Sequence, residues 1–256
     1  MAEVLKLEHV SKRFGDKEVL KDINFSVNSG EIIGYIGSNG AGKSTTIKLI
    51  LGLIDDYEGD VLVFGENVRG KTEYKRKIGY VPEVSDMYDN LTAFEYIGFV
   101  GMLYNIGSLN AVKKAKEMMS VFGIEEAIDG RIHTFSKGMR QKLSIITGML
   151  HNPDILFLDE PLSGIDANSV LVLKETLNNL KTAGKTIFYS SHILEVVEKL
   201  SDRILLLNEG KIVMDGTMDE AREKQSDSSL ESIFNDVTGF HDHEQLAKRF
   251  VDAFMS

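Results

Sequence analysis

The chain has 256 residues, of which 43% are hydrophobic and 27% charged, a composition typical of globular proteins that bury a sizeable core. Its 29 lysines and arginines against 39 aspartates and glutamates give a formal net charge of −10, which disfavours a general electrostatic grip on nucleic acid or on an anionic membrane surface. It has no cysteine, which excludes disulfides and thiol chemistry, and no apolar run approaches the ~18 residues of a membrane span. We therefore expect a chain that is soluble by itself.

The first part of the chain is predicted to form strands. Residues 3–14, "EVLKLEHVSKRF", and 19–27, "VLKDINFSV", alternate roughly between apolar and polar side chains, as half-buried antiparallel strands do. Residues 31–36, "EIIGYI", are instead a nearly continuous apolar run, followed by glycines and then by a helical pattern that includes Ile47, Ile50 and Leu51. This arrangement predicts a buried parallel strand that leads into a helix.

A phosphate-binding loop is predicted between that strand and that helix. Residues 37–44, "GSNGAGKS", match G-x-x-x-x-G-K-[ST] at every fixed position. In such a loop the backbone N–H groups and the helix N-terminus face an anion, Lys43 reaches the terminal phosphates, and the Ser44 hydroxyl can bind Mg²⁺. A glycine-rich turn without a ligand is the competing interpretation, which the strand-to-helix context disfavours. The residues predicted to bind the nucleotide are Gly37, Ser38, Asn39, Gly40, Ala41, Gly42, Lys43, Ser44 and Thr45.

The rest of the chain continues the alternation of strands and helices. The pattern is helical from about residue 92 to about residue 150. "DILFLDE" at 154–160 and "KTIFYSS" at 185–191 are predicted as buried strands, followed by helices from about 167 to 182 and from His192. Residues 203–216, "RILLLNEGKIVMDG", are predicted as antiparallel strands with a turn at 208–210. We therefore predict an α/β fold: a P-loop NTPase core with a mostly parallel sheet, and an N-terminal antiparallel β subdomain.

An acidic pair ends the strand "ILFLD". Its apolar residues place Asp159 at the carboxyl end of a buried strand, the edge at which open α/β sheets bind ligands. We predict that Asp159 holds Mg²⁺ through water and that Glu160 orients or deprotonates an attacking water. Acidic pairs also end strands merely because strands run into solvent, but a phosphate loop needs such a carboxylate for its metal.

Four segments occur in an order that resembles a known family: "GSNGAGKST", "FSKGMRQKL", "LFLDEPLSGID" and "YSSH". Together they resemble the ATP-binding subunit of an ABC transporter, over about residues 3–225. The "SKGM" segment resembles most closely the group that is paired with export-type or ABC-2 permeases. The resemblance implies the ABC ATPase fold, with a cassette at residues 1–225, a helical subdomain inserted at about 83–150, and a C-terminal helical tail at 226–256.

The resemblance also gives "FSKGM" a role. In the family this signature segment binds the γ-phosphate of ATP held by the phosphate loop of another subunit, so two complete sites require two cassettes arranged head to tail. We therefore expect a homodimer, with Ser136, Lys137 and Gly138 as nucleotide contacts. Lys137 replaces a family glycine, and its charge either favours the nucleotide or lies in solvent. Taken alone, the segment would be a polar helix start with Ser136 as N-cap.

Further site residues are implied by the same resemblance. Glu83 stands where the family usually has the Q-loop glutamine and is expected to act as a metal and coupling residue. Phe14 stands at the adenine-stacking position, where the alternative is a core phenylalanine on a strand. His192 matches the switch histidine, which contacts the γ-phosphate and aligns the water with Glu160. Asp166 matches the D-loop, which crosses the dimer interface and links the two sites.

The implied function is that of an ATPase motor. The chain would bind ATP and Mg²⁺, hydrolyse the ATP, and drive a separate integral-membrane permease, for export, from the cytoplasmic face of the cell membrane. The permease is expected to dock on the segment after Glu83. The alternative is a soluble ABC-type ATPase that acts on ribosomes or nucleic acid, which the single cassette and the negative charge disfavour, so no direct nucleic-acid partner is expected. Near the C-terminus, Leu246, Phe250 and Phe254 predict an amphipathic helix, which we expect to dock on its own domain; a site for a partner is the alternative.

Overall fold

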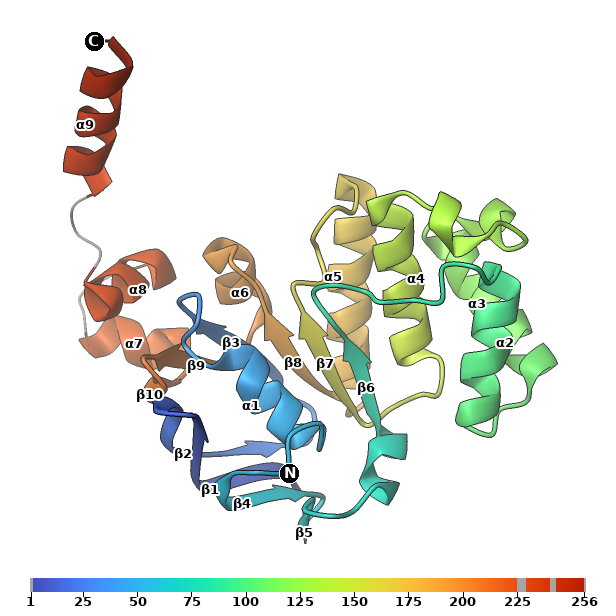
Figure 1. Cartoon of the computed structure of the whole chain (residues 1–256), viewed down its shortest axis with the longest axis horizontal. Helices are drawn as coiled ribbons and strands as arrows, with labels where there is room; N and C mark the ends of the chain where they lie inside the picture. Colours follow the sequence, from blue (N-terminus) through green and yellow to red (C-terminus); the bar gives the residue numbers. More distant parts are fainter. Residues whose placement is uncertain (1, 225–228, 240–242, 256) are drawn as a thin grey trace.

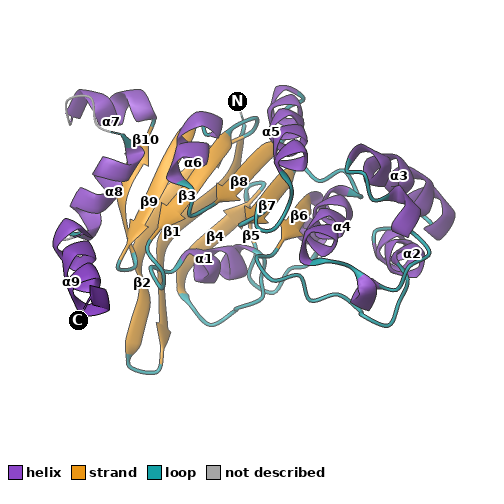
Figure 2. Ribbon diagram, turned by 90° about the horizontal axis from the view of Figure 1, so that it is seen from above, coloured by secondary structure: helices purple, strands orange, loops and turns teal. Residues whose placement is uncertain are grey.

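Two β-sheets lie at the centre of the molecule, with helices beside them (Figures 1 and 2). The structure is a computed structural model that describes residues 2–224, 229–239 and 243–255. The smaller sheet is antiparallel and has the order β2-β1-β4-β5. Its strands are β1 (Glu3–Phe14), β2 (Lys17–Asn28), β4 (Glu58–Val63) and β5 (Glu66–Asn67). The antiparallel N-terminal strands are therefore confirmed.

The larger sheet has the order β10-β9-β3-β8-β7-β6 and is parallel except for β10 at one edge. Its strands are β3 (Ile32–Gly37), β6 (Ile78–Val81), β7 (Ile155–Asp159), β8 (Thr186–Ser190), β9 (Arg203–Asn208) and β10 (Lys211–Gly216). The predicted parallel core is confirmed, but the interpretation of residues 203–216 was only half right. The strands β9 and β10 do pair antiparallel, whereas β9 runs parallel to β3 and residues 204–207 are buried, as expected for the continuous apolar run "ILLL".

The larger sheet carries a hydrophobic core on each face. Ile33 and Phe157 pack toward the smaller sheet together with Leu49 of α1 (Lys43–Ile50). Successive strand residues point to opposite faces, so Ile32 and Leu158 contribute to the other core. That second core is covered by α5 (Ala167–Thr182) and α6 (Leu194–Leu200). The helix predicted at 167–182 is confirmed, and the one predicted from His192 begins two residues later.

A helical subdomain lies beside β6 at the edge of the larger sheet (Figure 1). It consists of α2 (Ala93–Leu103), α3 (Ser108–Val121) and α4 (Lys137–Met149), with short 3₁₀ helices at Glu125–Ala127 and Ile132–Thr134. A further 3₁₀ helix, Glu73–Lys77, precedes β6. The helix α2 begins at a capping box, in which Thr92 and Glu95 each accept a backbone N–H of the other residue. The expectation of a helical region at 92–150 is confirmed.

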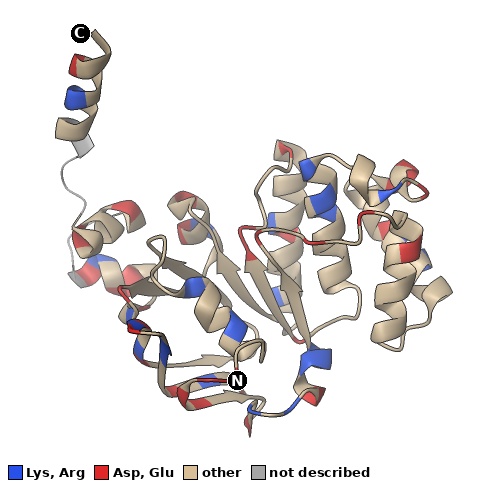
Figure 3. Ribbon diagram, viewed as in Figure 1, with Lys and Arg blue, Asp and Glu red and all other residues tan. Residues whose placement is uncertain are grey.

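The C-terminal part of the chain forms three helices, α7 (Met218–Lys224), α8 (Leu230–Thr238) and α9 (His243–Met255). Leu230 and Ile233 anchor α8 in the core, whereas α9 lies apart from the body (Figure 1). The predicted helix is confirmed, but its docking on the domain is not observed, since Phe250 is 73% and Phe254 81% exposed. Among the described residues, no helix is both long enough and apolar enough to cross a membrane. In Figure 3 acidic and basic segments lie along the smaller sheet and on the helices, whereas the central strands of the larger sheet are almost free of both.

Candidate nucleotide site

A cavity of about 500 Å³ opens at the carboxyl end of β3 and β7, where a parallel sheet is expected to bind its ligand. It brings together residues that lie far apart in the sequence, from β1 to the segment after β8. Eleven of them were predicted as site residues, whereas Lys17 and Val19 were not. The lining residues are Phe14, Lys17, Val19, Asn39, Gly40, Gly42, Lys43, Ser44, Thr45, Glu83, Asp159, Glu160 and His192.

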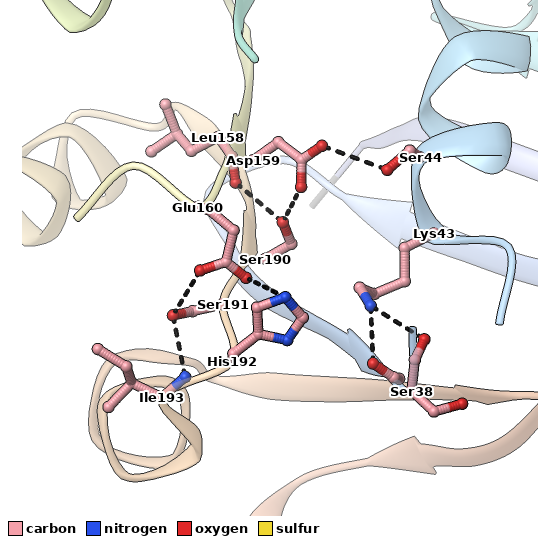
Figure 4. Close-up of polar contacts among 11 residues, drawn as sticks. Ser38, Lys43, Ser44, Leu158, Asp159, Glu160, Ser190, Ser191, His192 and Ile193 are labelled. Atoms are coloured by element: carbon pink, nitrogen blue, oxygen red, sulfur yellow. Dashed lines mark hydrogen bonds and ion pairs between the residues drawn. The ribbon is translucent and has the colours of Figure 1, made fainter. Parts of the chain in front are cut away.

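The loop between β3 and α1 is shaped for an anion. Gly42, the N-cap of α1, has φ 116°, and a Cβ on it would come within 2.6 Å of Leu20 Cδ2, so only glycine fits here. Lys43 Nζ donates to the carbonyl oxygens of Gly37 at 2.7 Å and Ser38 at 3.3 Å (Figure 4). Burial lowers the pKa of Lys43, while the nearby carboxylates of Asp159, Glu160 and Glu83 oppose that shift. A positive charge therefore lies at the N-terminal end of a helix, as phosphate binding requires.

Two side chains with oxygen atoms suited to a hard cation, Ser44 and Asp159, lie beside the loop. Ser44 Oγ donates to Asp159 Oδ2 at 3.4 Å, and Ser190 Oγ donates to Asp159 Oδ1 at 2.5 Å, which fixes the buried carboxylate (Figure 4). A hydroxyl and a carboxylate are ligands that Mg²⁺ prefers, and Mg²⁺ usually takes its remaining ligands from phosphate and water. The described residues contain no group of three or more His, Cys, Asp or Glu suited to a metal, so the pair fits Mg²⁺ only together with a nucleotide.

Glu160 is held in a strained and partly buried position. Its φ is +48°, unusual for a residue other than glycine, and such strain is concentrated at functional sites. Ser191 Oγ donates to Glu160 Oε2 at 3.4 Å, and His192 Nε2 lies 3.5 Å from Oε1. The buried Oε1 has no hydrogen-bond partner among the described residues. Burial raises the pKa of Glu160 above 4.5; the His192 imidazole opposes the shift, and the Asp159 charge adds to it.

Phe14 and Glu83 both lie at the cavity. Phe14 is 49% exposed, so the core-phenylalanine interpretation is wrong, and Lys12 Nζ lies 4.7 Å from the centre of its ring. One ring face is thus covered by a cation. Glu83 is exposed and lines the same cavity, on the segment that leads from β6 into the helical subdomain.

The structure does not bring Ser136, Lys137, Gly138 or Asp166 to this cavity. Ser136 is the N-cap of α4, and its Oγ accepts a hydrogen bond from Met139 N at 3.2 Å, as the capping interpretation predicts. A Cβ on Gly138 would come within 2.5 Å of Gly164 O, so glycine is needed where α4 meets the segment before α5.

Asp166 caps α5 by accepting from Ser169 N at 3.0 Å and Ser169 Oγ at 2.7 Å. The Lys142 ammonium, 2.7 Å from Asp166 Oδ2, holds the pKa of that carboxyl well below its usual range, and the Ser169 bonds act in the same direction. Sequence analysis missed Lys142, Ser190 and Ser191 as partners of site residues. The two serines could have been found from their place at the end of a predicted core strand, next to His192.

Comparisons with known proteins agree with this arrangement. A family model described as "ABC transporter" matches residues 20–163. The linearmycin resistance ATP-binding protein LnrL of Bacillus subtilis (strain 168) is 39% identical over 84% of this chain and 69% of its own length. The bacitracin transport ATP-binding protein BcrA of Bacillus licheniformis is 35% identical over 88% of this chain and 73% of its own length. A solved structure of an ATP-binding subunit of an ABC transporter superimposes with a TM-score of 0.85 at 32% identity, and covers 91% of this chain and 98% of that one.

Proposed function

Since this chain belongs to the ABC transporter family and is an ATP-binding subunit with ATPase activity, we propose that two copies act head to tail, each completing the ATP site of the other. One observation supports this proposal above the others. The cavity of one chain contains the phosphate loop, the acidic pair and His192, but not the signature residues Ser136 and Gly138. A second copy can supply them from the start of α4, where free backbone N–H groups and the helix dipole favour an anion.

The proposed roles follow the positions of the side chains. Lys43 and the loop hold the β- and γ-phosphates, and the exposed face of Phe14 stacks on the adenine. Ser44 and Asp159 hold Mg²⁺, which supplies charge neutralisation at the phosphates, with Glu83 as a further oxygen ligand from the cavity wall. The other residues of the loop, from Gly37 to Thr45, contribute backbone contacts.

Hydrolysis requires a base beside the γ-phosphate, and the position of Glu160 in the cavity wall supports that role. Its Oε1 has no hydrogen-bond partner in the part of the chain that the structure describes, and it can accept a proton from an attacking water. His192 Nε2, 3.5 Å from that oxygen, positions the water between the carboxylate and the phosphate. Lys137 and Asp166 would meet the second copy at the interface, where Asp166 links the two sites.

The ATPase cycle of the dimer would drive a separate permease. We propose that this permease is an exporter, as the names of LnrL and BcrA suggest. A hollow of about 550 Å³ lined by residues 87–91 and Phe99 is a suitable docking place for a cytoplasmic permease helix. The chain would then work at the cytoplasmic face of the membrane. These relatives are transport and resistance proteins, which favours transport over an action on ribosomes or nucleic acid.

Complementation between two inactive variants tests the head-to-tail dimer. Lys43→Ala disables a phosphate loop and Ser136→Asp disables a signature segment, so each variant alone should lack ATPase activity. An equal mixture should recover activity, at most about a quarter of the wild-type rate, because at most half of its dimers are mixed and each of those has one complete site out of two. An inactive mixture, in which both chains are folded and the Ser136→Asp chain still binds ATP, would contradict the proposal.

A further inference from the structure

Three consecutive residues in the first turns of α4 bond to two other segments of the chain, the one around Asp89 and the one between β7 and α5. Arg140 Nη1 donates to Asp89 Oδ1 at 2.6 Å. Gln141 Nε2 donates to the carbonyl oxygen of Pro161, directly after Glu160, at 3.3 Å. Lys142 Nζ lies 2.7 Å from Asp166 Oδ2. The start of α4 is therefore connected both to the catalytic side of the cavity and to the segment around Asp89.

Asp89 lies in the wall of the hollow formed by residues 87–91 and Phe99. The wall is bonded to the chain just before α4, since the carbonyl oxygens of Asp89 and Leu91 accept from His133 N at 3.1 Å and Ile132 N at 2.9 Å. The Asn90 carbonyl accepts from Arg131 Nη1 at 2.9 Å. These bonds use backbone oxygens, so they persist when the side chain at 89 is changed. The Asp89–Arg140 pair is a side-chain contact that extends this connection into α4 itself.

Arg140 is also one helical turn from the signature serine, because its backbone N–H donates to Ser136 O at 3.0 Å. A displacement of Asp89 therefore pulls on the turn that carries Ser136 and Gly138. We propose that the Asp89–Arg140 ion pair is a positioning contact, which makes the placement of the signature turn depend on what fills the hollow. This inference rests on the proposed function, in which a permease helix fills the hollow and Ser136 faces ATP in the partner copy.

An ordinary surface ion pair is the competing explanation. The side chains of Arg140 and Asp89 are 25% and 54% exposed, and pairs of such exposure contribute little to stability. If the pair were merely stabilising, its removal would lower the melting temperature slightly and would leave the effect of ATP on the hollow unchanged. A positioning pair must act in both directions, because coupling between two sites is reciprocal. ATP bound at the signature turn should therefore change the amide hydrogen exchange of the residues that line the hollow, even without a permease.

Amide hydrogen exchange of residues 86–92 measures that change. Exchange is measured on the full chain with and without Mg-ATP. The chain carries Glu160→Gln, so that ATP is bound and not consumed. We expect ATP to slow exchange at 86–92 by about fivefold, the lower end of usual allosteric coupling. With Arg140→Gln added, the effect should fall below about twofold, and with the charge swap Asp89→Arg and Arg140→Asp it should return.

A matched control removes a similar pair elsewhere. Lys185 and Asp154 lie 3.1 Å apart with side chains 16% and 49% exposed, at the amino end of β7 and β8, so Lys185→Gln should leave the ATP effect unchanged. Equal ATP effects with and without Arg140→Gln, or no ATP effect in the parent chain, would overturn the inference. The exchange experiment needs no permease. Its failure can therefore be distinguished from a failure of the proposed function, which the complementation between two inactive variants tests independently.

Discussion

Substitution of Ser136 separates its two proposed roles, helix cap and phosphate contact. In the structure Ser136 Oγ accepts one hydrogen bond, from Met139 N at 3.2 Å. Ser136→Ala removes that bond and should cost about 1 kcal/mol of unfolding free energy, whereas Ser136→Asp should cost almost nothing, because Asp caps helices as well as Ser and its charge suits the helix N-terminus. For folding alone, aspartate is thus the mild substitution.

For dimerisation the order should be reversed. In a head-to-tail dimer the added carboxylate would lie about 4 Å from the γ-phosphate, where two like charges repel by about 4 kcal/mol at an effective dielectric constant of 20. That energy corresponds to roughly a thousandfold weaker ATP-dependent dimer for each affected site. Ser136→Asp should therefore stay monomeric, while Ser136→Ala still dimerises.

The assay is light scattering with and without Mg-ATP in the Glu160→Gln background, together with thermal unfolding of each variant. Thr92 provides the control, since its Oγ1 accepts from Glu95 N at the same distance of 3.2 Å but caps α2 instead of the signature helix. Thr92→Asp should leave dimerisation unchanged. If Ser136→Asp dimerises with ATP as well as its parent does, Ser136 is only a cap and the composite site is refuted.

Three more predictions concern residues at the cavity. His192→Ala should lower ATP turnover by at least ~100-fold with ATP binding retained, as expected for a group that positions the reacting water; near-normal turnover would remove it from the mechanism. Phe14→Ala should weaken ATP binding by about tenfold and Phe14→Tyr should not, measured by titration calorimetry, because stacking needs only an aromatic face; equal affinities would contradict stacking. Because burial raises the pKa of Glu160, the folded chain binds that proton more tightly than the unfolded chain, so the stability from this group is complete below pH 4.5 and is lost as pH rises through the raised pKa. Glu160→Gln should therefore melt at a higher temperature than its parent at neutral pH, and the difference in melting temperature should close toward pH 4.5. ATP turnover of the parent should rise with pH over the same range, as Glu160 ionises. A difference in melting temperature that does not depend on pH would refute the raised pKa.

Local patterns predicted most of the residues at the cavity. The phosphate loop and the acidic pair each lie at the end of a buried strand, so strand pattern and motif together locate them. The parallel sheet then brings Lys43 and Asp159 to the same edge, which follows from topology without any knowledge of side-chain contacts.

Features that depend on contacts between distant segments could not be predicted in this way. Lys142 pairs with Asp166 from a different helix, and no spacing rule connects the two. The strand β6 has only four residues, "IGYV", too few for a clear period. The amphipathic pattern of α9 predicts a helix correctly but does not state what covers its apolar face, and in the structure that face is exposed.

The most direct test of the transporter account is affinity purification of this chain from native membranes dissolved in mild detergent, followed by mass spectrometry of the proteins that accompany it. The account predicts a multi-span membrane protein in stoichiometric amount, which is lost when the hollow is filled by a bulky charge, for example Met87→Arg, in a chain that still binds ATP. Recovery of the chain only with ribosomal proteins or nucleic acid would contradict it.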